Sequence, residues 1–281
     1  SLEQAVEGQS PIRTIPPGAL RFVAYTDWTD VNGGHYLQLK SGEWVRASPL
    51  AGYSQFQGLL FEENPKISFG WIVEDTITRS LPSYQAAESG VALTREQLVQ
   101  IYDVQEAENT KWYMVGINQW VERRYIRQVV ANPTPPAGVE NGRWIEVNLY
   151  EQTVTVYENG HLVFATLIAS GEDPFFTKPG LFKIYEKKPY ETMTGAFEAD
   201  RSDYYYLEDV PWTMYFDEAR ALHGAYWRAW FGYTQSHGCV NMSIADSHWL
   251  YDWAHVGDWV FVWDPTNQTP TDPSFYTQGG A

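Results

Sequence analysis

The residues of this sequence that could carry out covalent chemistry lie in its last third. Cys239 is the only cysteine among 281 residues, and it lies in the hexapeptide Ser236-His237-Gly238-Cys239-Val240-Asn241. His223 lies 16 positions earlier. A lone cysteine with a histidine elsewhere in the chain is the arrangement expected of a thiol nucleophile and its base. Because most free cysteines are small buried apolar residues, this pair alone leaves both interpretations open.

Three motifs in this region resemble those of the L,D-transpeptidase (YkuD-type) catalytic domain of bacterial cell-wall enzymes. They are Ala221-Leu222-His223-Gly224, the hexapeptide around Cys239, and Thr177-Lys178-Pro179-Gly180-Leu181-Phe182. The resemblance covers about residues 143–264. It implies an enzyme in which the cysteine forms a thioester with the third residue of a peptidoglycan stem peptide. An amine of a neighbouring stem then takes the acyl group, which makes a cross-link.

The resemblance also implies catalytic roles for individual residues. Cys239 is the expected nucleophile and His223 its base, with the backbone carbonyl of Gly224 orienting the imidazole ring. His237 could itself be the base, but side chains one or two positions from a nucleophile usually face elsewhere on a strand. We therefore expect His237 to position substrate or to frame an oxyanion pocket, with the amides of Gly238 and Cys239 as donors.

Further residues are expected on the substrate-binding side. Met214 and Tyr215 fall where the family builds its substrate pocket. Trp227 belongs to an aromatic loop between the histidine and the cysteine, which either grips a peptide stem or is anchored in a neighbouring core. Ser236 and Asn241 flank the thiol, and we expect them chiefly to fix the conformation of the loop around it.

The sequence around these motifs predicts a β-sandwich with one well-signalled helix. Alternating apolar residues indicate strands, and Asn159-Gly160 between two such runs is a strong hairpin signal. Ser243 as N-cap, with Asp246 three residues later, predicts a helix that runs through Trp253 to Gly257. The apolar run 258–263 then closes the domain as a strand.

The whole chain is predicted to be mostly β, with small barrel repeats before the sandwich. A self-comparison at an offset of 76 aligns Tyr36 with Trp112 and Trp44 with Trp120, which indicates a duplicated unit. The second copy resembles the bacterial Src-homology-three-like barrel, and the first matches only its later half. The expected boundaries are a flexible arm at 1–18, a partial repeat at 19–66, the barrel at 67–131, a Pro-rich linker at 132–141, the catalytic domain at 142–264 and a flexible tail at 265–281.

Composition limits the partners of the protein. The net charge of −16 argues against nucleic acid, because phosphate binding depends on Lys and Arg. The expected partners are peptidoglycan stem peptides, as donor and as amine acceptor. Glycan strands would be a further partner if exposed aromatic side chains of the N-terminal region form a platform instead of a core. The histidines show no metal-ligand spacing, and we expect no metal and no cofactor.

Localisation and two alternatives depend on the resemblance. The sequence contains no apolar run that could cross a bilayer and opens with no signal segment. We expect a bacterial, extracytoplasmic protein, in the periplasm or cell wall, whose signal or anchor has been removed. With water as acceptor the same site would be an L,D-carboxypeptidase, and a degenerate site would leave a wall-binding protein. A different Cys-His amidase or peptidase matches the hexapeptide poorly.

Overall fold

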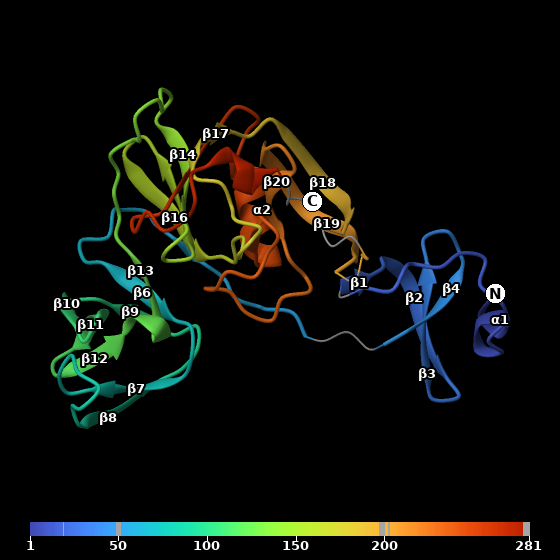
Figure 1. The fold of residues 1–281 in the computed structure, drawn as a ribbon, viewed down its shortest axis with the longest axis horizontal. Helices are drawn as coiled ribbons and strands as arrows, with labels where there is room; N and C mark the ends of the chain where they lie inside the picture. The colour runs from blue at the N-terminus through green and yellow to red at the C-terminus, as the bar shows by residue number, and fades with distance from the viewer. Residues whose placement is uncertain (19, 49–51, 197–199, 202, 278–281) are drawn as a thin grey trace.

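The computed structural model describes residues 1–18, 20–48, 52–196, 200–201 and 203–277. Strands make up nearly all of the regular elements of these residues, and two α-helices accompany them. The prediction of a mostly β protein is therefore confirmed. Figure 1 shows three bodies, with a small N-terminal meander at one end, a sandwich in the centre and the 67–131 domain at the other end.

The N-terminal body is a three-stranded antiparallel meander that follows a short helix. The Ser1 side chain accepts a hydrogen bond from the Gln4 amide, and the Gln4 side chain bonds back to Ser1. The expected arm at 1–18 thus begins with a capped helical turn. The elements are α1 (Leu2–Val6), β2 (Tyr25–Val31), β3 (Gly34–Leu39) and β4 (Trp44–Ala47).

The 67–131 domain consists of two sheets that share one apolar core. Their strand orders are β10-β11-β12-β7-β8 and β13-β6-β9. Ile72, Tyr113 and Ile126 are fully buried between them. The more specific assignment to a Src-homology-three-like barrel remains a prediction. The elements are β6 (Phe69–Ile72), β7 (Thr76–Arg79), β8 (Glu88–Leu93), β9 (Leu98–Gln100), β10 (Asp103–Ala107), β11 (Thr110–Gly116), β12 (Gln119–Glu122), the 3-10 turn η1 (Arg123–Tyr125) and β13 (Ile126–Val129).

The internal repeat corresponds to the same meander in both places. Strands β2, β3 and β4 of the first copy match β10, β11 and β12 of the second. Thr29 pairs with Tyr36 and Gln105 with Trp112, and Leu37 pairs with Val45 as Tyr113 does with Val121. All of the pairs between β10 and β11 have a counterpart 76 residues earlier. The two copies therefore share register as well as sequence.

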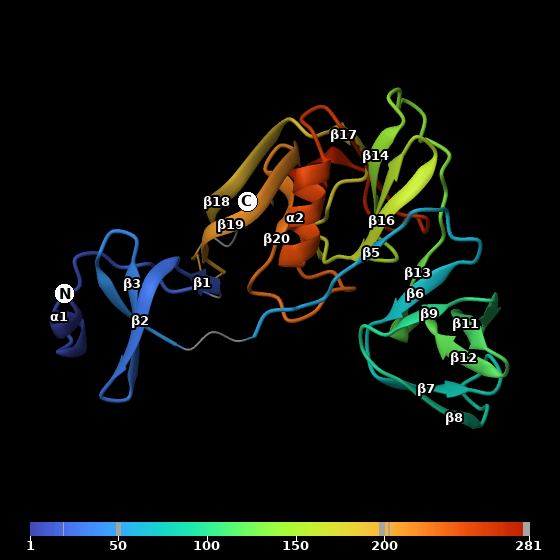
Figure 2. The same ribbon diagram turned by 180° about the vertical axis from the view of Figure 1, so that it is seen from behind.

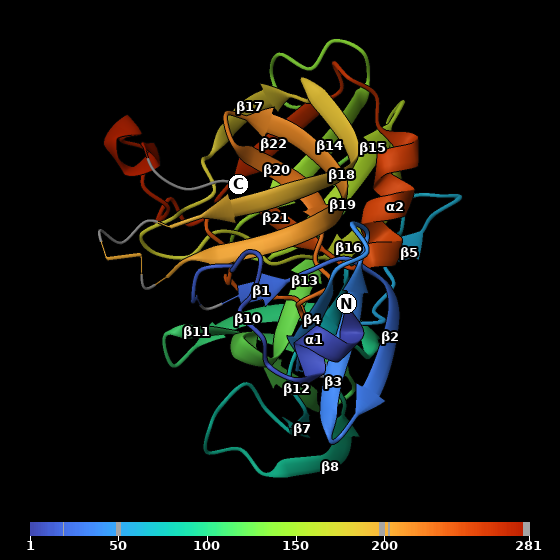
Figure 3. The same ribbon diagram turned by 90° about the vertical axis from the view of Figure 1, so that its right-hand side faces the viewer.

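The central body is a sandwich of two sheets with one helix beside them. One sheet has the order β17-β22-β14-β15-β16-β5, in which β5 is Leu59–Leu60. The other has the order β1-β19-β20-β21, in which β1 is Leu20–Phe22, and β18 also pairs with β19. Figure 3 looks toward the second sheet, with α2 at its side. The elements are β14 (Arg143–Asn148), β15 (Thr153–Glu158), β16 (His161–Leu167), β17 (Gly180–Lys183), β18 (Glu186–Gly195), β19 (Tyr205–Asp217), β20 (Arg220–Gly224), β21 (Val240–Met242), α2 (Ile244–Trp253) and β22 (Trp259–Trp263).

Helix α2 packs on β19 and β20 and completes the apolar core between the sheets. It begins where predicted, because the Ser243 hydroxyl accepts a hydrogen bond from the Asp246 amide at 3.1 Å. It ends at Trp253 and does not continue to Gly257. Among the described residues, no helix is long and apolar enough to cross a membrane.

Two short strands correct the expected boundary of the 19–66 unit. Strand β1 (Leu20–Phe22) pairs with β19, and β5 (Leu59–Leu60) pairs with β16. Both add to edges of the sandwich sheets, so only the meander between them is a separate repeat. Figure 2 shows β5 beside β16 and away in space from the meander, although β5 follows β4 closely in the sequence.

The C-terminal residues also contact the sandwich. The 3-10 turn η2 (Pro273–Tyr276) buries the Tyr276 side chain, which is 4% exposed. Its carbonyl oxygen accepts a hydrogen bond from Arg220 Nη2 at 3.2 Å. The part of the expected 265–281 tail that the structure describes is thus anchored by an aromatic side chain and a buried arginine.

Candidate active site

Two adjacent parallel strands bring the cysteine and the histidine to one face of their sheet. Leu222 of β20 pairs with Val240 of β21, and His223 pairs with Asn241. Side chains alternate along a strand, and paired residues point to the same side. Leu222 and Val240 face the sandwich core, so His223, Asn241 and the preceding Cys239 face the opposite side.

The Cys239 thiol is almost fully enclosed. Its side chain is 6% exposed and packs with Tyr215 and Ala221. Sγ lies 3.7 Å from the carbonyl oxygen of Ala219, to which the thiol donates. Burial raises the pKa of the thiol to about 11. The cysteine is therefore a protonated thiol at neutral pH and needs a base to attack a carbonyl carbon.

The His223 ring is held in one orientation and one tautomer. Nδ1 lies 3.1 Å from the carbonyl oxygen of Gly224, and a carbonyl can only accept, so Nδ1 carries the hydrogen. Burial lowers the pKa of the imidazole to about 4. At neutral pH the ring is uncharged, and Nε2 has a lone pair that can accept a proton.

The turn before the cysteine is organised by the Ser236 hydroxyl. This hydroxyl donates to the carbonyl oxygen of Cys239 at 2.6 Å and accepts from the Gly238 amide at 3.1 Å. The expectation that the Gly238 amide is an oxyanion donor is therefore corrected, because its single hydrogen is already used within the turn. Thr177 donates to the Gly238 carbonyl oxygen at 2.8 Å and fixes the other side of the turn.

A small cavity of about 40 Å³ opens beside the thiol, and most of the predicted site residues line it. His237 lies against the Tyr205 ring, with 5.8 Å between ring centroids, and the Trp227 ring lies 5.7 Å from that of His223. Tyr215 faces the thiol from β19 through its contact with Cys239. The predicted residues among its lining are His223, Trp227, Ser236, His237, Cys239 and Asn241.

Met214 does not belong to this site. It pairs with Leu222 and is fully buried in the core between the sheets, whereas Tyr215 pairs with Ala221 and faces the thiol. Adjacent residues of a strand face opposite sides, so both could not line one pocket. The prediction of Met214 as a substrate-binding residue was wrong for this reason.

Other lining residues were missed from the sequence. Among the described residues that line the cavity, Arg228 alone carries a permanent charge. Its Nη1 donates to Gln235 Oε1 at 3.0 Å, while its buried Nε has no hydrogen-bond partner among the residues that the structure describes. An arginine in the loop between the histidine and the cysteine of an acidic protein was the available signal. The other missed residues come from distant strands, and they are Leu20, Met193, Tyr205 and Leu207.

No group of three or more His, Cys, Asp or Glu side chains within the described part of the chain is arranged to hold a metal ion. The thiol of Cys239 and the imidazole of His223 are the reactive groups that line the cavity.

Known proteins similar to this chain cover different shares of it. The family profile of the L,D-transpeptidase catalytic domain (YkuD) matches residues 142–262. The putative L,D-transpeptidase YciB of Bacillus subtilis is 23% identical over 135 residues, which are 39% of this chain and 59% of that protein. The chain thus spans less than two thirds of the length of this curated relative.

Two solved structures illustrate the range of similarity. The catalytic domain of the E. faecium L,D-transpeptidase acylated by ertapenem is 27% identical, covering 43% of this chain and 96% of that chain, with a TM-score of 0.38. The L,D-transpeptidase from Mycobacterium smegmatis is 16% identical, covering 88% of this chain and 95% of that chain, with a TM-score of 0.41.

Residues 142–262 form a YkuD-type L,D-transpeptidase catalytic domain. The meander and the 67–131 domain lie outside this match.

Proposed function

We propose that the protein is a cysteine-dependent L,D-transpeptidase that cross-links peptidoglycan stem peptides. The observation that carries the proposal is that Cys239 and an oriented, uncharged His223 lie on one face of adjacent strands and line the same cavity. A neutral thiol beside a neutral imidazole is the resting state from which a base can activate a nucleophile.

In the first step the thiol turns from Ala219 toward His223 and gives its proton to Nε2. Sγ attacks the carbonyl carbon of the third residue of a donor stem and forms a C–S bond. The C–N bond to the terminal D-alanine then breaks, and the imidazolium returns the proton to the departing amine. The Gly224 carbonyl oxygen holds the ring during both transfers, as its 3.1 Å contact with Nδ1 indicates.

In the second step the side-chain amine of a neighbouring stem attacks the thioester. His223 takes a proton from this amine, the C–S bond breaks, and Cys239 recovers its hydrogen through the imidazole. Water in place of the amine would release a tripeptide stem, which is the carboxypeptidase reaction. Access of the amine and exclusion of water at the thioester decide between the two reactions.

The charge of Arg228 favours an acyl-donor stem peptide that ends in a carboxylate. Its guanidinium is the one permanent charge among the described residues that line the cavity, and its Nε is unpaired there. Burial lowers its pKa to about 10, so it is still a cation at neutral pH. A carboxylate on the departing D-alanine would supply the missing acceptor.

The direct test is intact-protein mass spectrometry after incubation with a tetrapeptide-stem muropeptide, with and without an acceptor stem. The expected result is an acyl adduct on the wild type, absent from Cys239→Ala, which converts to a linked dimer when acceptor is added. An adduct that yields only tripeptide would instead identify a carboxypeptidase. A folded wild-type protein with no adduct and no product would overturn the proposal.

We also propose an extracytoplasmic location, in the periplasm or cell wall, where this substrate is found. A hollow of about 300 Å³ in the 67–131 domain favours an additional wall-binding role, since Tyr84, Trp112 and Trp120 line it. Exposed Tyr84 is the accessible member, at 46%. Tyr84→Ala should weaken retention on purified wall sacculi, whereas Tyr102→Ala, which removes a tyrosine of similar exposure outside the hollow, should not.

A further inference from the structure

The 67–131 domain holds the loop that joins the two catalytic strands through hydrogen bonds and ring contacts. We call residues 225–235 the crossover loop. Arg127 of β13 donates from Nε to the carbonyl oxygen of Gly232 at 2.6 Å, and its guanidinium lies 5.0 Å from the centroid of the Tyr233 ring. The Tyr233 hydroxyl donates to the carbonyl oxygen of Val73 at 3.2 Å. Two residues in the middle of the loop are thus held by another domain.

Apolar contacts also hold the crossover loop against the 67–131 domain. Phe231 is 3% exposed and shares a core with Trp71 and Val73 of the 67–131 domain and with Trp144 of the sandwich. Gly232 has φ +95, and a Cβ there would lie 2.5 Å from Val73 Cγ1. The backbone therefore approaches Val73 as closely as only a glycine permits.

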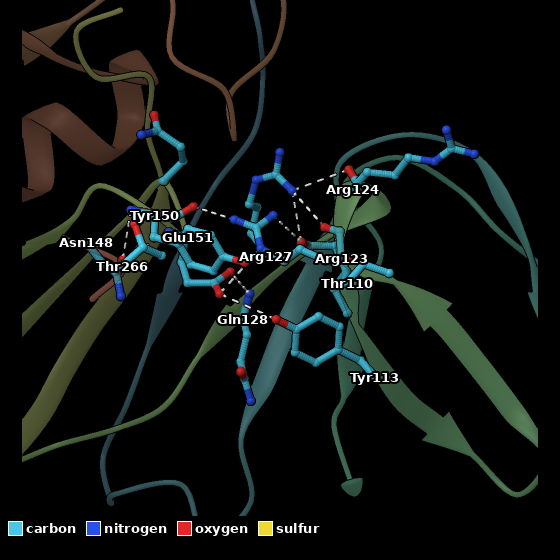
Figure 4. A network of polar contacts seen from close by, with 12 residues as sticks. Thr110, Tyr113, Arg123, Arg124, Arg127, Gln128, Asn148, Tyr150, Glu151 and Thr266 are labelled. Carbon is cyan, nitrogen blue, oxygen red and sulfur yellow. Dashed lines mark hydrogen bonds and ion pairs between the residues drawn. The ribbon is translucent and has the colours of Figure 1, made fainter. Parts of the chain in front are cut away.

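Arg127 is itself rigidly placed. Its side chain is 7% exposed, and Nη1 donates to the carbonyl oxygens of Arg123 and Ile126 at 3.1 and 3.0 Å. Beside it, Glu151 of the sandwich accepts from the Gln128 amide at 2.9 Å, and Figure 4 shows this network between the two domains. An arginine that is buried and hydrogen-bonded through Nε and Nη1 is a suitable fixed point for a loop.

The crossover loop carries side chains of the active site. Trp227 and Arg228 line the cavity beside the thiol. Arg228 is tied back to Gln235 at the far end of the same loop by a 3.0 Å hydrogen bond. A shift at Gly232, between these two residues, would therefore displace the cation and the ring that face the substrate.

We propose that the 67–131 domain is a structural part of the active site, with Arg127 as a positioning residue that acts through Gly232 on Trp227 and Arg228. The inference rests on the proposed acyl transfer for its kinetic consequence. Substrate binding should suffer more than the chemical step, because the loop supplies neither the nucleophile nor the base.

The test compares Arg127→Ala, Arg127→Lys and Gly232→Ala with the wild type in the full-length protein. Arg124→Ala is the matched control, since Arg124 lies in the same domain with its side chain 64% exposed and paired to Glu122. Two readouts are needed. One is hydrogen exchange of peptides spanning the loop, and the other is the separate measurement of KM and kcat for acyl transfer.

Arg127→Ala and Gly232→Ala should each accelerate exchange in the loop, where the Gly232 amide is bonded to the Ile168 carbonyl oxygen at 2.7 Å. Both should raise KM by about tenfold with kcat changed less than about threefold, and Arg127→Lys, which keeps a donor, should recover part of the loss. Arg124→Ala should match the wild type in both readouts.

Faster exchange in the loop with unchanged KM would overturn the positioning role while leaving the proposed function intact. Unchanged exchange in both Arg127→Ala and Gly232→Ala would overturn the anchor itself, whatever the kinetics. A wild-type protein without acyl transfer would overturn the proposed function and the kinetic part of this inference. The exchange data would then still test whether Arg127 holds the crossover loop through Gly232.

Discussion

His223 and Asn241 are register partners on two adjacent parallel strands, β20 and β21. Parallel neighbours cannot be joined by a tight turn and need a crossover of about a dozen residues or more. The 15 residues between His223 and Cys239 are therefore the length of such a crossover. The spacing of the two reactive residues therefore follows from sheet topology. The segment between them lines the site through Trp227 and Arg228.

The first prediction concerns the pH dependence of catalysis. The pKa of His223 is lowered to about 4 and that of Cys239 raised to about 11, in both cases by burial. The expected kcat/KM profile is flat from about pH 5 to pH 10, without the limbs that an ordinary His and Cys would give. A profile with an acid limb near 6.5 would show that His223 is solvated when it acts.

The same burial makes a prediction for stability. Because His223 binds its proton more weakly in the folded state, the unfolded chain takes up more protons between the folded pKa of about 4 and the ordinary 6.5. The stability that the neutral imidazole of His223 contributes is fully present above pH 6.5. As the pH falls toward 4, the free energy of unfolding decreases by about 3 kcal/mol. Denaturant unfolding at both pH values should show a smaller loss for His223→Gln than for the wild type.

Gly224 should not tolerate a side chain. A Cβ there would lie 2.6 Å from Ser247 Oγ and 3.0 Å from Pro211 Cγ, and the displaced carbonyl would no longer hold the imidazole. We expect Gly224→Ala to lower kcat/KM by at least about tenfold. Ser247→Ala in the same protein should restore part of this loss by removing the nearest atom. Gly52→Ala, with open space around the glycine, is the control.

Arg228 should discriminate substrates by their terminal carboxylate. Arg228→Gln should raise KM by about tenfold or more for a tetrapeptide stem, because a charge-assisted hydrogen bond is lost. The wild type should prefer this stem to the same stem with an amidated terminus, and the variant should not. Equal loss on both substrates would indicate that Arg228 only shapes the loop.

Two methionines provide a matched comparison of the two faces of the sheet. Met214 lies in the core and Met193 lines the cavity. Met214→Ala should lower the free energy of unfolding by about 2–5 kcal/mol without changing KM. Met193→Ala should change KM for the stem peptide. A change in KM with Met214→Ala at unchanged stability would contradict the assignment of these faces.

Local sequence patterns predicted much of the sandwich, and long-range pairing limited the rest. The Asn159-Gly160 hairpin and the Ser243 cap depend on neighbouring residues, and both are present. In contrast, β1 has only three residues, and its Leu20 pairs with the distant Tyr205. The sequence near Leu20 therefore does not predict that this residue lies beside the cavity. The error at Met214 was avoidable, since strict alternation already separated it from Tyr215.

The two meanders share one register in two different surroundings. The offset of 76 holds across both turns of each copy, so the two meanders match without insertion or deletion between Asp27 and Val45 of the first. Their surroundings differ, since among the described residues only the second copy continues into further paired strands, β7 and β8. The repeated unit is accordingly smaller than a domain: it consists of two linked hairpins, and it occurs in two different architectural settings.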